Sequence, residues 1–344
     1  MSAALERQPV PEAAPIPLIE LRQVSRRFVK ALDAAAKVAN LLGAGLREEV
    51  VRAVDNVDLK VFSGEVVGLV GESGCGKSTL GRIVAGILKP SSGSVHYRGR
   101  ETGSLHGAEA RAATLAVQMI FQDPFASLNP RLRVRDIIGE APVYHGLVDR
   151  DGVDRYVADT MRRVGLDPSL RRRYPHQFSG GQRQRIGIAR ALAVKPEFIV
   201  CDEAVAALDV SIQAQVLNLF MKLREEFSLT YLFISHDLGV VRHLSDRVAI
   251  MYLGRVVEEG PTEELFERPN HPYTVALLAE IPRLDTRRRD FAPVKGEIPS
   301  PLDPPPGCHF HLRCPHATVR CRVEAPVLKE IAPGRRSACH LNDG

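Results

Sequence analysis

Residues 71–78 read Gly71-Glu72-Ser73-Gly74-Cys75-Gly76-Lys77-Ser78, and this stretch decides the fold. It follows an apolar strand pattern over Val66–Val70 and precedes a helix that we expect over about Ser78–Ile87. Glycines at these positions let the backbone curl until successive N–H groups face one anion, and the helix N-terminus adds the positive end of its dipole. Lys77 would reach the β- and γ-phosphates of a nucleotide, and the Ser78 hydroxyl would bind Mg²⁺. The stretch therefore predicts a phosphate-binding loop.

A second motif, Phe178-Ser179-Gly180-Gly181-Gln182, lies about a hundred residues further along and opens a helix predicted over Gln182–Ala193. Most enzymes with a phosphate-binding loop lack this motif. With the motifs described next, the chain resembles the ATP-binding subunit of an ABC transporter over residues 18–268. The outward-facing end of this helix cannot reach its own phosphate loop, so the resemblance implies a dimer. In such a dimer, the resemblance implies that the nucleotide of the facing subunit is contacted by Ser179, Gly180, Gly181 and Gln182 of the signature motif and by Asp209 of the D-loop.

The same resemblance supplies the groups for hydrolysis. Gln122 resembles the Q-loop glutamine, which would touch Mg²⁺ and the attacking water. An apolar strand, Phe198–Cys201, would deliver Asp202 to the metal and Glu203 to the lytic water. His236 resembles the switch histidine facing the γ-phosphate, so the implied catalytic residues are Glu203, His236 and Gln122, and the implied Mg²⁺ ligands are Ser78 and Gln122. The resemblance implies that Phe28 stacks on the adenine, and the alternative is that Phe28 is a core residue. The other implied ATP contacts are Gly71, Glu72, Ser73, Gly74, Cys75, Gly76, Lys77, Ser78, Thr79 and Asp202.

Two positions depart from the family pattern. The family usually has Pro where Ala204 stands, and Ser or Thr where Ala206 stands. Neither position supplies a phosphate ligand, so we expect hydrolysis to persist, while coupling through the D-loop could differ.

The chain divides into three parts by composition and motif. Residues 1–17 form a flexible leader, 18–268 an ABC ATPase domain, and 269–344 a C-terminal extension. Inside the ATPase domain we place an insertion at about 29–52 and a helical subdomain at about 124–190. The implied fold class is α/β, a P-loop ABC-type nucleotide-binding domain with a parallel-sheet core, an antiparallel β subdomain and a helical signature subdomain, plus a small cysteine-containing extension. The expected further elements are strands over Leu18–Phe28 and Val54–Phe62, a partly helical Ala31–Val51, and parallel strands around 198–202, 230–235 and 247–252.

Composition limits the partners and the location. With 344 residues and a net charge of +5, the chain lacks the strong basic stripe of a nucleic-acid-binding protein. No apolar stretch approaches the roughly 18–20 residues that span a bilayer, and the N-terminus lacks a signal-peptide pattern. We therefore expect a cytoplasmic chain whose link to the membrane comes through partner subunits.

The residues after Leu253 indicate the type of transporter. Glu267-Arg268-Pro269-Asn270-His271-Pro272-Tyr273-Thr274 resembles the segment that closes the ATPase core in importers of dipeptides, oligopeptides and, in related systems, nickel. The resemblance implies a peripheral protein at the cytoplasmic face of the plasma membrane. Its implied partners are a second, paralogous ATPase, two membrane permeases and an extracytoplasmic solute-binding protein. Two alternatives fit less well: an exporter ATPase fits the core but not this segment, and a nucleic-acid-acting ATPase would need paired cores or coiled-coil insertions.

Four of the six cysteines lie near the C-terminus: Cys308, Cys314, Cys321 and Cys339. In a cytosolic chain such clustering favours metal ligands over disulfides. The spacings match neither zinc ribbons nor ferredoxins, so the residues alone predict a four-thiolate site with the metal undecided. The arrangement resembles the C-terminal element of peptide-importer ATPases and so implies a [4Fe–4S] cluster, with Zn²⁺ or metal-free thiols as alternatives. The remaining two cysteines, Cys75 and Cys201, are expected to be small buried fillers.

Overall fold

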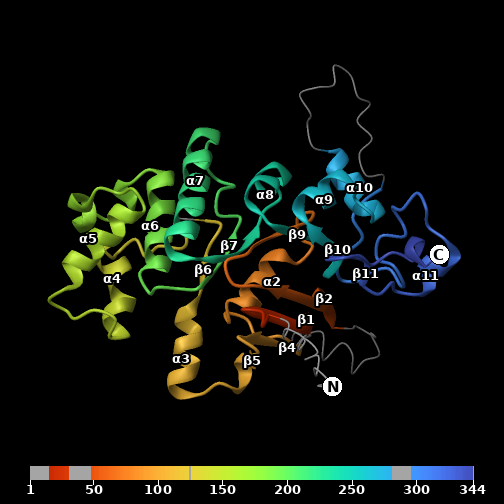
Figure 1. Cartoon of the computed structure of the whole chain (residues 1–344), viewed down its shortest axis with the longest axis horizontal. Coiled ribbons are helices and arrows are strands. Elements are labelled where there is room, and N and C mark those ends of the chain that lie inside the picture. The colour runs from red at the N-terminus through yellow and green to blue at the C-terminus, as the bar shows by residue number, and fades with distance from the viewer. Residues whose placement is uncertain (1–14, 31–47, 124, 281–295, 344) are drawn as a thin grey trace, which may run out of the picture.

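The computed structural model describes residues 15–30, 48–123, 125–280 and 296–343. Within these residues the strands form two sheets. One helix packs between the sheets, other helices cover the opposite face of the larger sheet, and a helical lobe extends to one side (Figure 1). The strands are β1 (Ile19–Lys30), β2 (Glu49–Val61), β3 (Val66–Val70), β4 (Ser92–Tyr97), β5 (Arg100–Glu101), β6 (Val117–Ile120), β7 (Phe198–Asp202), β8 (Thr230–Ile234), β9 (Arg247–Tyr252), β10 (Arg255–Pro261), β11 (Lys329–Ala332) and β12 (Arg335–Ser337). The helices are α2 (Lys77–Val84), α3 (Gly107–Ala116), α4 (Val134–Tyr144), α5 (Val153–Arg163), α6 (Gly180–Leu192), α7 (Val210–Phe227), α8 (Leu238–Leu244), α9 (Thr262–Glu267), α10 (Pro272–Ala279) and α11 (Val319–Val323).

The main sheet has the strand order β11-β12-β10-β9-β3-β8-β7-β6. Strands β9, β3, β8, β7 and β6 run parallel, and the strands beyond β9 continue the sheet in antiparallel fashion. Every residue of β3, β7 and β8 is buried, which explains why these strands read as unbroken apolar runs rather than alternating patterns. Their carboxyl ends share one edge of the sheet, where functional residues collect. The predicted α/β class with a parallel-sheet core is confirmed.

The smaller sheet is antiparallel, with the order β2-β1-β4-β5. Strand β2 begins at Glu49, five residues before the predicted start at Val54, because Glu49, Val50 and Val51 pair with β1. Valines and the apolar partners they meet across β1 favour the extended backbone there. Residues 31–47 lie outside the described residues.

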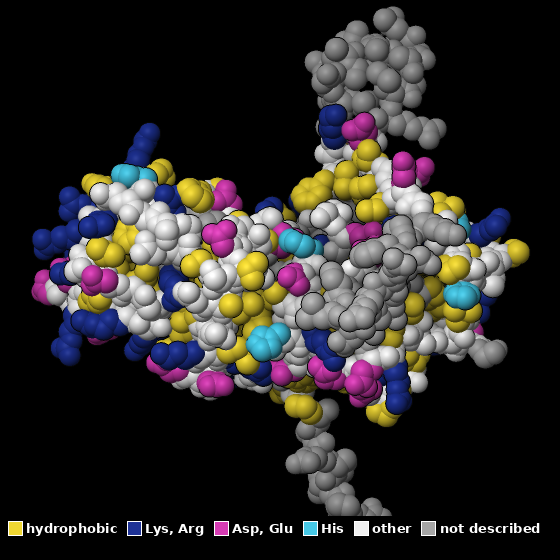
Figure 2. Space-filling model, turned by 90° about the horizontal axis from the view of Figure 1, so that it is seen from above, with side chains coloured by type: hydrophobic (Ala, Val, Ile, Leu, Met, Phe, Trp, Pro, Cys, Tyr) yellow, Lys and Arg dark blue, Asp and Glu magenta, His cyan; other side chains and the backbone are white. Residues whose placement is uncertain are grey.

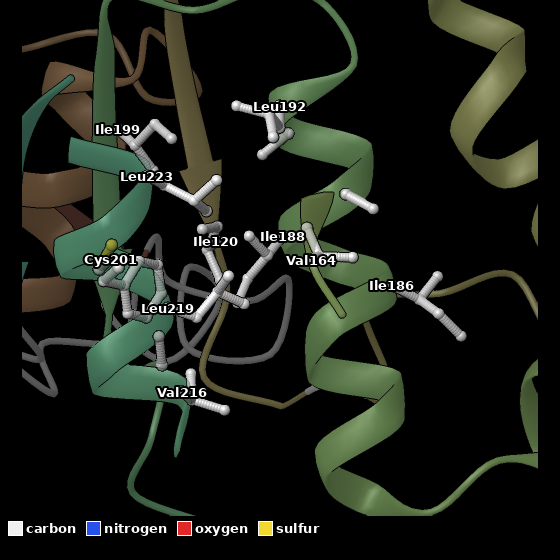
Figure 3. Packing of buried hydrophobic residues seen from close by; sticks show 14 of the residues in the cluster. Ile120, Val164, Ile186, Ile188, Leu192, Ile199, Cys201, Val216, Leu219 and Leu223 are labelled. Atoms are coloured by element: carbon white, nitrogen blue, oxygen red, sulfur yellow. The ribbon is translucent and has the colours of Figure 1, made fainter. Parts of the chain in front are cut away.

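The helical lobe consists of α4, α5 and α6, and α6 joins it to the core. Figure 3 shows Ile188 and Leu192 of α6 facing Leu219 and Leu223 of α7, with Ile120 of β6 between them. These side chains are buried, and the same cluster continues into α4 and α5. Lysine and arginine side chains gather at the outer end of the lobe (Figure 2). The lobe is therefore fixed to the sheet through α6, the helix that carries the Ser-Gly-Gly-Gln motif.

The C-terminal region lies at the edge of the main sheet opposite to β6, where β12 and β11 extend the sheet beyond β10. Strand β12 pairs with β10, with Glu258 opposite Ser337 and Glu259 opposite Arg336. Phe310 enters a buried aromatic cluster, with ring centroids 5.3 Å from Tyr252 and 5.4 Å from Tyr273. None of the helices in the described part of the chain has both the length and the apolar character that a membrane crossing requires.

We expect the stability of this region to depend on the protonation of His271. Its Nδ1 accepts the Tyr273 N–H at 3.0 Å at the start of α10, and burial lowers the pKa of His271 to about 4. Because the folded-state pKa lies below the ordinary value of 6.5, the neutral form stabilises the fold fully above pH 6.5, and this contribution is lost as the pH falls toward 4.

We expect the wild-type protein to lose about 2 kcal/mol of unfolding free energy through this group between pH 7.5 and pH 5. Urea unfolding of the wild type and of His271→Asn at both pH values measures it, since the asparagine cannot titrate. Equal losses in the two proteins would show that His271 is not the sensitive group.

Candidate nucleotide site

The phosphate loop leaves the carboxyl end of β3 and enters α2, as the sequence predicts. Gly74 and Gly76 have φ of 80° and 107°, a region that glycine adopts far more readily than other residues. A Cβ on Gly76 would also collide with the Ala53 carbonyl oxygen of β2, and one on Gly71 with the Met251 carbonyl oxygen of β9. The loop is thus enclosed between neighbouring strands, and its glycines are required by both conformation and space.

Lys77, the first residue of α2, turns back into this loop. Its Nζ donates to the Gly71 carbonyl at 2.7 Å and to the Glu72 carbonyl at 3.0 Å, and the residue is 4% exposed. An ammonium group held by two carbonyls of the loop places positive charge where a polyphosphate would lie.

Ser78 and Asp202 meet although they lie far apart in the sequence. The Ser78 hydroxyl donates to Asp202 Oδ1 at 2.7 Å, and Asp202 ends the buried strand β7. Burial raises the pKa of Asp202, and the Ser78 hydrogen bond and the charge of Arg82 partly offset that effect. A hydroxyl and a buried carboxylate at this distance form an oxygen donor set of the kind that Mg²⁺ prefers.

Glu203 follows directly on β7 and is flanked by two further predicted residues. Its Oε2 accepts a hydrogen bond from Gln122 Nε2 at 2.7 Å, and its Oε1 lies 3.5 Å from His236 Nδ1. Glu203 has φ of 47°, and its N–H donates to the Ile234 carbonyl at 3.0 Å. This unusual backbone turns the carboxylate away from the sheet and toward the loop.

Four of these groups line one open pocket of about 320 Å³, whereas Asp202 and His236 lie behind or beside its wall. Lys77, Ser78, Gln122 and Glu203 are among its walls, together with four more predicted ATP contacts and three residues that no motif indicates, Val51, Ala53 and Pro301. The four further predicted contacts are Ser73, Gly74, Gly76 and Thr79.

Phe28 is placed beside this pocket rather than in its wall. It pairs with Val51, which does line the pocket, and the Arg26 guanidinium lies 4.8 Å from its ring centroid. Its ring is partly exposed, so it is not a core residue. Adenine stacking by Phe28 stays a prediction.

The signature residues lie apart from that pocket. Ser179 is the N-cap of α6: its Oγ accepts the Gln182 N–H at 3.3 Å, and the Gln182 side chain accepts the Ser179 N–H at 3.1 Å. Gly181 approaches Ile212 of α7 so closely that a Cβ would clash with that side chain. Asp209 is the exposed N-cap residue of α7. Among the described residues, no member of the signature motif contributes to the wall of the pocket.

The unusual Ala204 is buried, as is Val205 after it, and both belong to the core cluster beneath α6 and α7. Ala206 is exposed. The first departure from the family pattern therefore fills the core, whereas the second changes a surface position.

The four C-terminal cysteines gather in one part of the extension. The Cys308 N–H donates to the Cys321 carbonyl at 2.9 Å, and Cys308 and Cys314 both pack against the aromatic cluster. Burial raises the pKa of the Cys308 thiol to about 11, and the charges of Cys321, Cys339 and Cys314 add to that effect. Across the described ranges, however, no set of three or more His, Cys, Asp or Glu side chains is arranged so that it could hold a metal ion. The predicted metal site stays a prediction. Cys75 and Cys201 are buried, as expected.

The sequence analysis missed how the extension contacts the phosphate loop. Arg313 forms an ion pair with Glu72, and the Tyr273 hydroxyl accepts the Glu72 N–H. These pairs join residues more than two hundred positions apart, and no local pattern marks Arg313 as their partner.

Comparison with known proteins agrees with this geometry. A family model described as ABC transporter matches residues 54–206, and one described as oligopeptide/dipeptide transporter, C-terminal region, matches residues 257–321. The chain is 52% identical to the oligopeptide transport ATP-binding protein AppF of Bacillus subtilis, covering 85% of this chain and 90% of the relative. It is 50% identical to the oligopeptide transport ATP-binding protein OppF of Escherichia coli, covering 81% and 85%, respectively.

Solved structures show the same fold. CbiO1 from Clostridium perfringens, part of an ABC transporter complex, aligns with a TM-score of 0.59 at 24% identity, covering 73% of this chain and 91% of that one. A dimeric bacterial ABC transporter cassette, MJ0796, aligns with a TM-score of 0.59 at 27% identity, covering 71% and 98%. From its loop geometry, its sheet and these relatives, the chain belongs to the ABC transporter ATPases, and within them to the ATP-binding proteins of oligopeptide and dipeptide transporters.

Proposed function

We propose that this chain binds and hydrolyses MgATP to drive the import of oligopeptides or dipeptides through membrane permeases. The observation that carries this proposal is the convergence of Lys77, Ser78, Gln122 and Glu203 on one pocket, in a chain whose C-terminal region matches the peptide-transporter model. Its partners in this proposal are a second, paralogous ATPase, two permeases and an extracytoplasmic solute-binding protein, and its place is the cytoplasmic face of the membrane.

Within the pocket the residues divide the chemistry. Lys77 and the loop N–H groups bind the β- and γ-phosphates, and Ser78, Gln122 and Asp202 would hold Mg²⁺, which supplies charge neutralisation when bound. Glu203 orients and polarises the water that attacks the γ-phosphate in line. Gln122 orients the Glu203 carboxylate through a hydrogen bond to one oxygen, and His236 lies 3.5 Å from the other oxygen. Fixed charges and dipoles of this kind supply most of the rate enhancement in phosphoryl transfer.

Each site would be completed by a second ATPase subunit. Ser179 caps α6 at an exposed position, and Gly180 and Gly181 have no side chains that would cover the helix end. The N–H groups of this helix end are therefore available to a facing nucleotide. Closure of two subunits over two ATP molecules, followed by reopening after hydrolysis, would move the permeases.

Transport in membranes that contain the cognate permeases tests this function. We expect ATP-dependent uptake of short peptides, which stops when this subunit is omitted. Uptake of Ni²⁺ in place of peptides would redirect the proposal to another solute, and ATP hydrolysis without any uptake would contradict it.

We also propose that Cys308, Cys314, Cys321 and Cys339 hold a [4Fe–4S] cluster with a structural role. Their gathering in one part of the extension supports a shared site, since the Cys308 N–H donates to the Cys321 carbonyl and Cys308 and Cys314 pack against the same aromatic cluster. The residues before them, 296–306, are rich in proline and poor in core-forming side chains. A site closed by four thiolates has no open position for chemistry, so its effect would be to hold the extension together.

Anaerobic purification followed by iron, sulfide and zinc analysis tests this site. We expect about four irons and four sulfides per chain, as a [4Fe–4S] cluster requires, and loss of the metal in Cys314→Ser. Cys75→Ser is the matched control, because that thiol is buried beside Lys77 and distant along the chain. Stoichiometric zinc, or thiols without metal, would contradict the cluster.

A further inference from the structure

Every hydrogen-bonding group of Glu72, the second residue of the phosphate loop, has a partner. Its N–H donates to the Tyr273 hydroxyl at 2.9 Å, and its carbonyl accepts from Lys77 Nζ at 3.0 Å. Its carboxylate accepts two hydrogen bonds from Arg313, with Nη1 to Oε2 at 2.8 Å and Nη2 to Oε1 at 2.9 Å. The Glu72 carbonyl also accepts the Cys75 N–H at 3.3 Å. Two of the four partners, Tyr273 and Arg313, come from the region matched by the peptide-transporter model and lie outside the stretch matched by the ABC transporter model.

Arg313 is itself held rigidly. Its side chain is 5% exposed, and its guanidinium carbon lies 5.9 Å from the ring centroids of both Tyr252 and Phe310. The Tyr252 hydroxyl accepts a further, long hydrogen bond from Nη1 at 3.4 Å. A planar guanidinium seated on aromatic rings fixes the direction of both of its donors. The two-bond contact with Glu72 is therefore a geometric constraint as well as an electrostatic attraction.

This constraint bears on the lysine that binds phosphate. The Glu72 carbonyl is one of two carbonyls that hold Lys77 Nζ, so a shift of Glu72 moves a group that sets the position of the ammonium. The Glu72 carboxylate also places a negative charge in a loop that must accept a triphosphate. The Arg313 charge compensates it, which removes a repulsion that would otherwise oppose binding.

A second contact joins the extension to the same loop. His309 Nδ1 lies 3.1 Å from the Leu253 carbonyl, and the N–H of the next residue, Gly254, donates to the Cys75 carbonyl at 2.9 Å. The extension therefore contacts the phosphate loop directly at Glu72 and is linked to Cys75 only through the turn at Leu253 and Gly254.

We infer that Arg313 is a positioning residue for nucleotide binding: it fixes the phosphate loop through Glu72, so that the C-terminal extension sets the ATP affinity of the core. The inference rests on ATP binding at this loop, and Lys77→Ala provides the reference for that assignment.

Equilibrium binding of a fluorescent ATP analogue to the full chain tests the inference. Loss of a two-bond charged contact in Arg313→Ala should raise the dissociation constant about tenfold. Arg313→Lys should cause a smaller loss, because an ammonium cannot reproduce the planar pair of donors. Arg320→Ala is the matched control: Arg320 makes an equivalent two-bond contact with Glu324 in the same extension, but at the surface. Its affinity should equal that of the wild type.

The coupling itself is read from a double-mutant cycle. In the Glu72→Gln background the Arg313→Ala change should alter the dissociation constant by less than about twofold, because its partner charge is already gone. In the assembled transporter, Arg313→Ala should raise KM by the same factor as the dissociation constant and leave kcat nearly unchanged, a split that general destabilisation does not produce.

The variants distinguish a failure of the nucleotide-site assignment from a failure of the positioning role of Arg313. If Lys77→Ala keeps its affinity, the assignment of the nucleotide site fails. If Lys77→Ala loses affinity but Arg313→Ala behaves as Arg320→Ala does, or if the Arg313 effect persists in the Glu72→Gln background, the positioning role is overturned. Should Arg313→Ala fail to fold, the same comparisons with Arg313→Lys decide.

Discussion

Glu203→Gln should bind MgATP as tightly as the wild type, while ATP turnover in the assembled transporter falls at least about a hundredfold. The glutamine keeps the size of the side chain and can still contact Gln122, so the pocket retains its shape. It removes the negative charge that orients and polarises the attacking water. Phosphate release at saturating MgATP measures the turnover, and binding to the isolated subunit measures the affinity.

A matched control lies at the other end of the same strand. Glu197 immediately precedes β7, and its carboxylate is partly exposed beside Tyr97 and Arg98, remote from the phosphate loop. Glu197→Gln should keep turnover within about twofold, as surface substitutions usually do. Near-normal turnover in Glu203→Gln would show that another group activates the water.

Lys77→Ala should weaken nucleotide binding to the isolated subunit about a hundredfold, because it removes charged contacts worth about 3 kcal/mol to the phosphates. Ser179 should behave differently, because its predicted contact is with the nucleotide of the partner subunit. Substitution of Ser179 should leave binding to the isolated subunit unchanged and lower turnover only after assembly. Lys222→Ala, an exposed lysine on α7, is the control for the loss of a positive charge.

The cap geometry decides which Ser179 variant is informative. Ser179→Ala removes the N-cap of α6 and should destabilise the fold by about 1 kcal/mol, which complicates its use. Ser179→Asp keeps a capping oxygen but places a negative charge against the partner's phosphates. Thermal unfolding should therefore distinguish the two variants, whereas both lower turnover in the assembly. Equal losses of affinity for Lys77→Ala and Ser179→Asp in the isolated subunit would contradict the two-subunit site.

Local chemistry made most of the core predictable. The glycines around Lys77 predict the phosphate loop, because few other residues adopt that backbone conformation. The apolar run before Asp202 predicts a buried strand that ends at this carboxylate. Since carboxyl ends of neighbouring parallel strands share one edge, the meeting of Ser78 with Asp202 and of Gln122 with Glu203 follows from the order of the motifs.

Contacts without a local signal were not predictable. The Arg313 to Glu72 pair depends on how the extension folds back over the sheet, and an arginine between a leucine and a cysteine carries no mark of its partner. The place of Pro301 in the pocket wall was equally unpredictable, because it also depends on how the extension folds back. The beginning of β2 was misplaced because Glu49 and the residues near it read equally as helix, and only pairing with β1 selects the extended form.

The pairing of β12 with β10 has a consequence for any shortened form of the protein. A chain ending near residue 280 would leave β10 as an open edge, with unpaired N–H and C=O groups that template intermolecular strand association. It would also remove Arg335 and Arg336, the arginines that pair with the buried carboxylates of Glu258 and Glu259. Glu258 would keep only the backbone N–H groups of Asn270 and His271, and Glu259 only Arg247 at 3.6 Å, so both carboxylates would lose stabilising charge. A catalytic core trimmed in this way should precipitate during expression. The last two strands thus cover a sheet edge that would otherwise favour self-association.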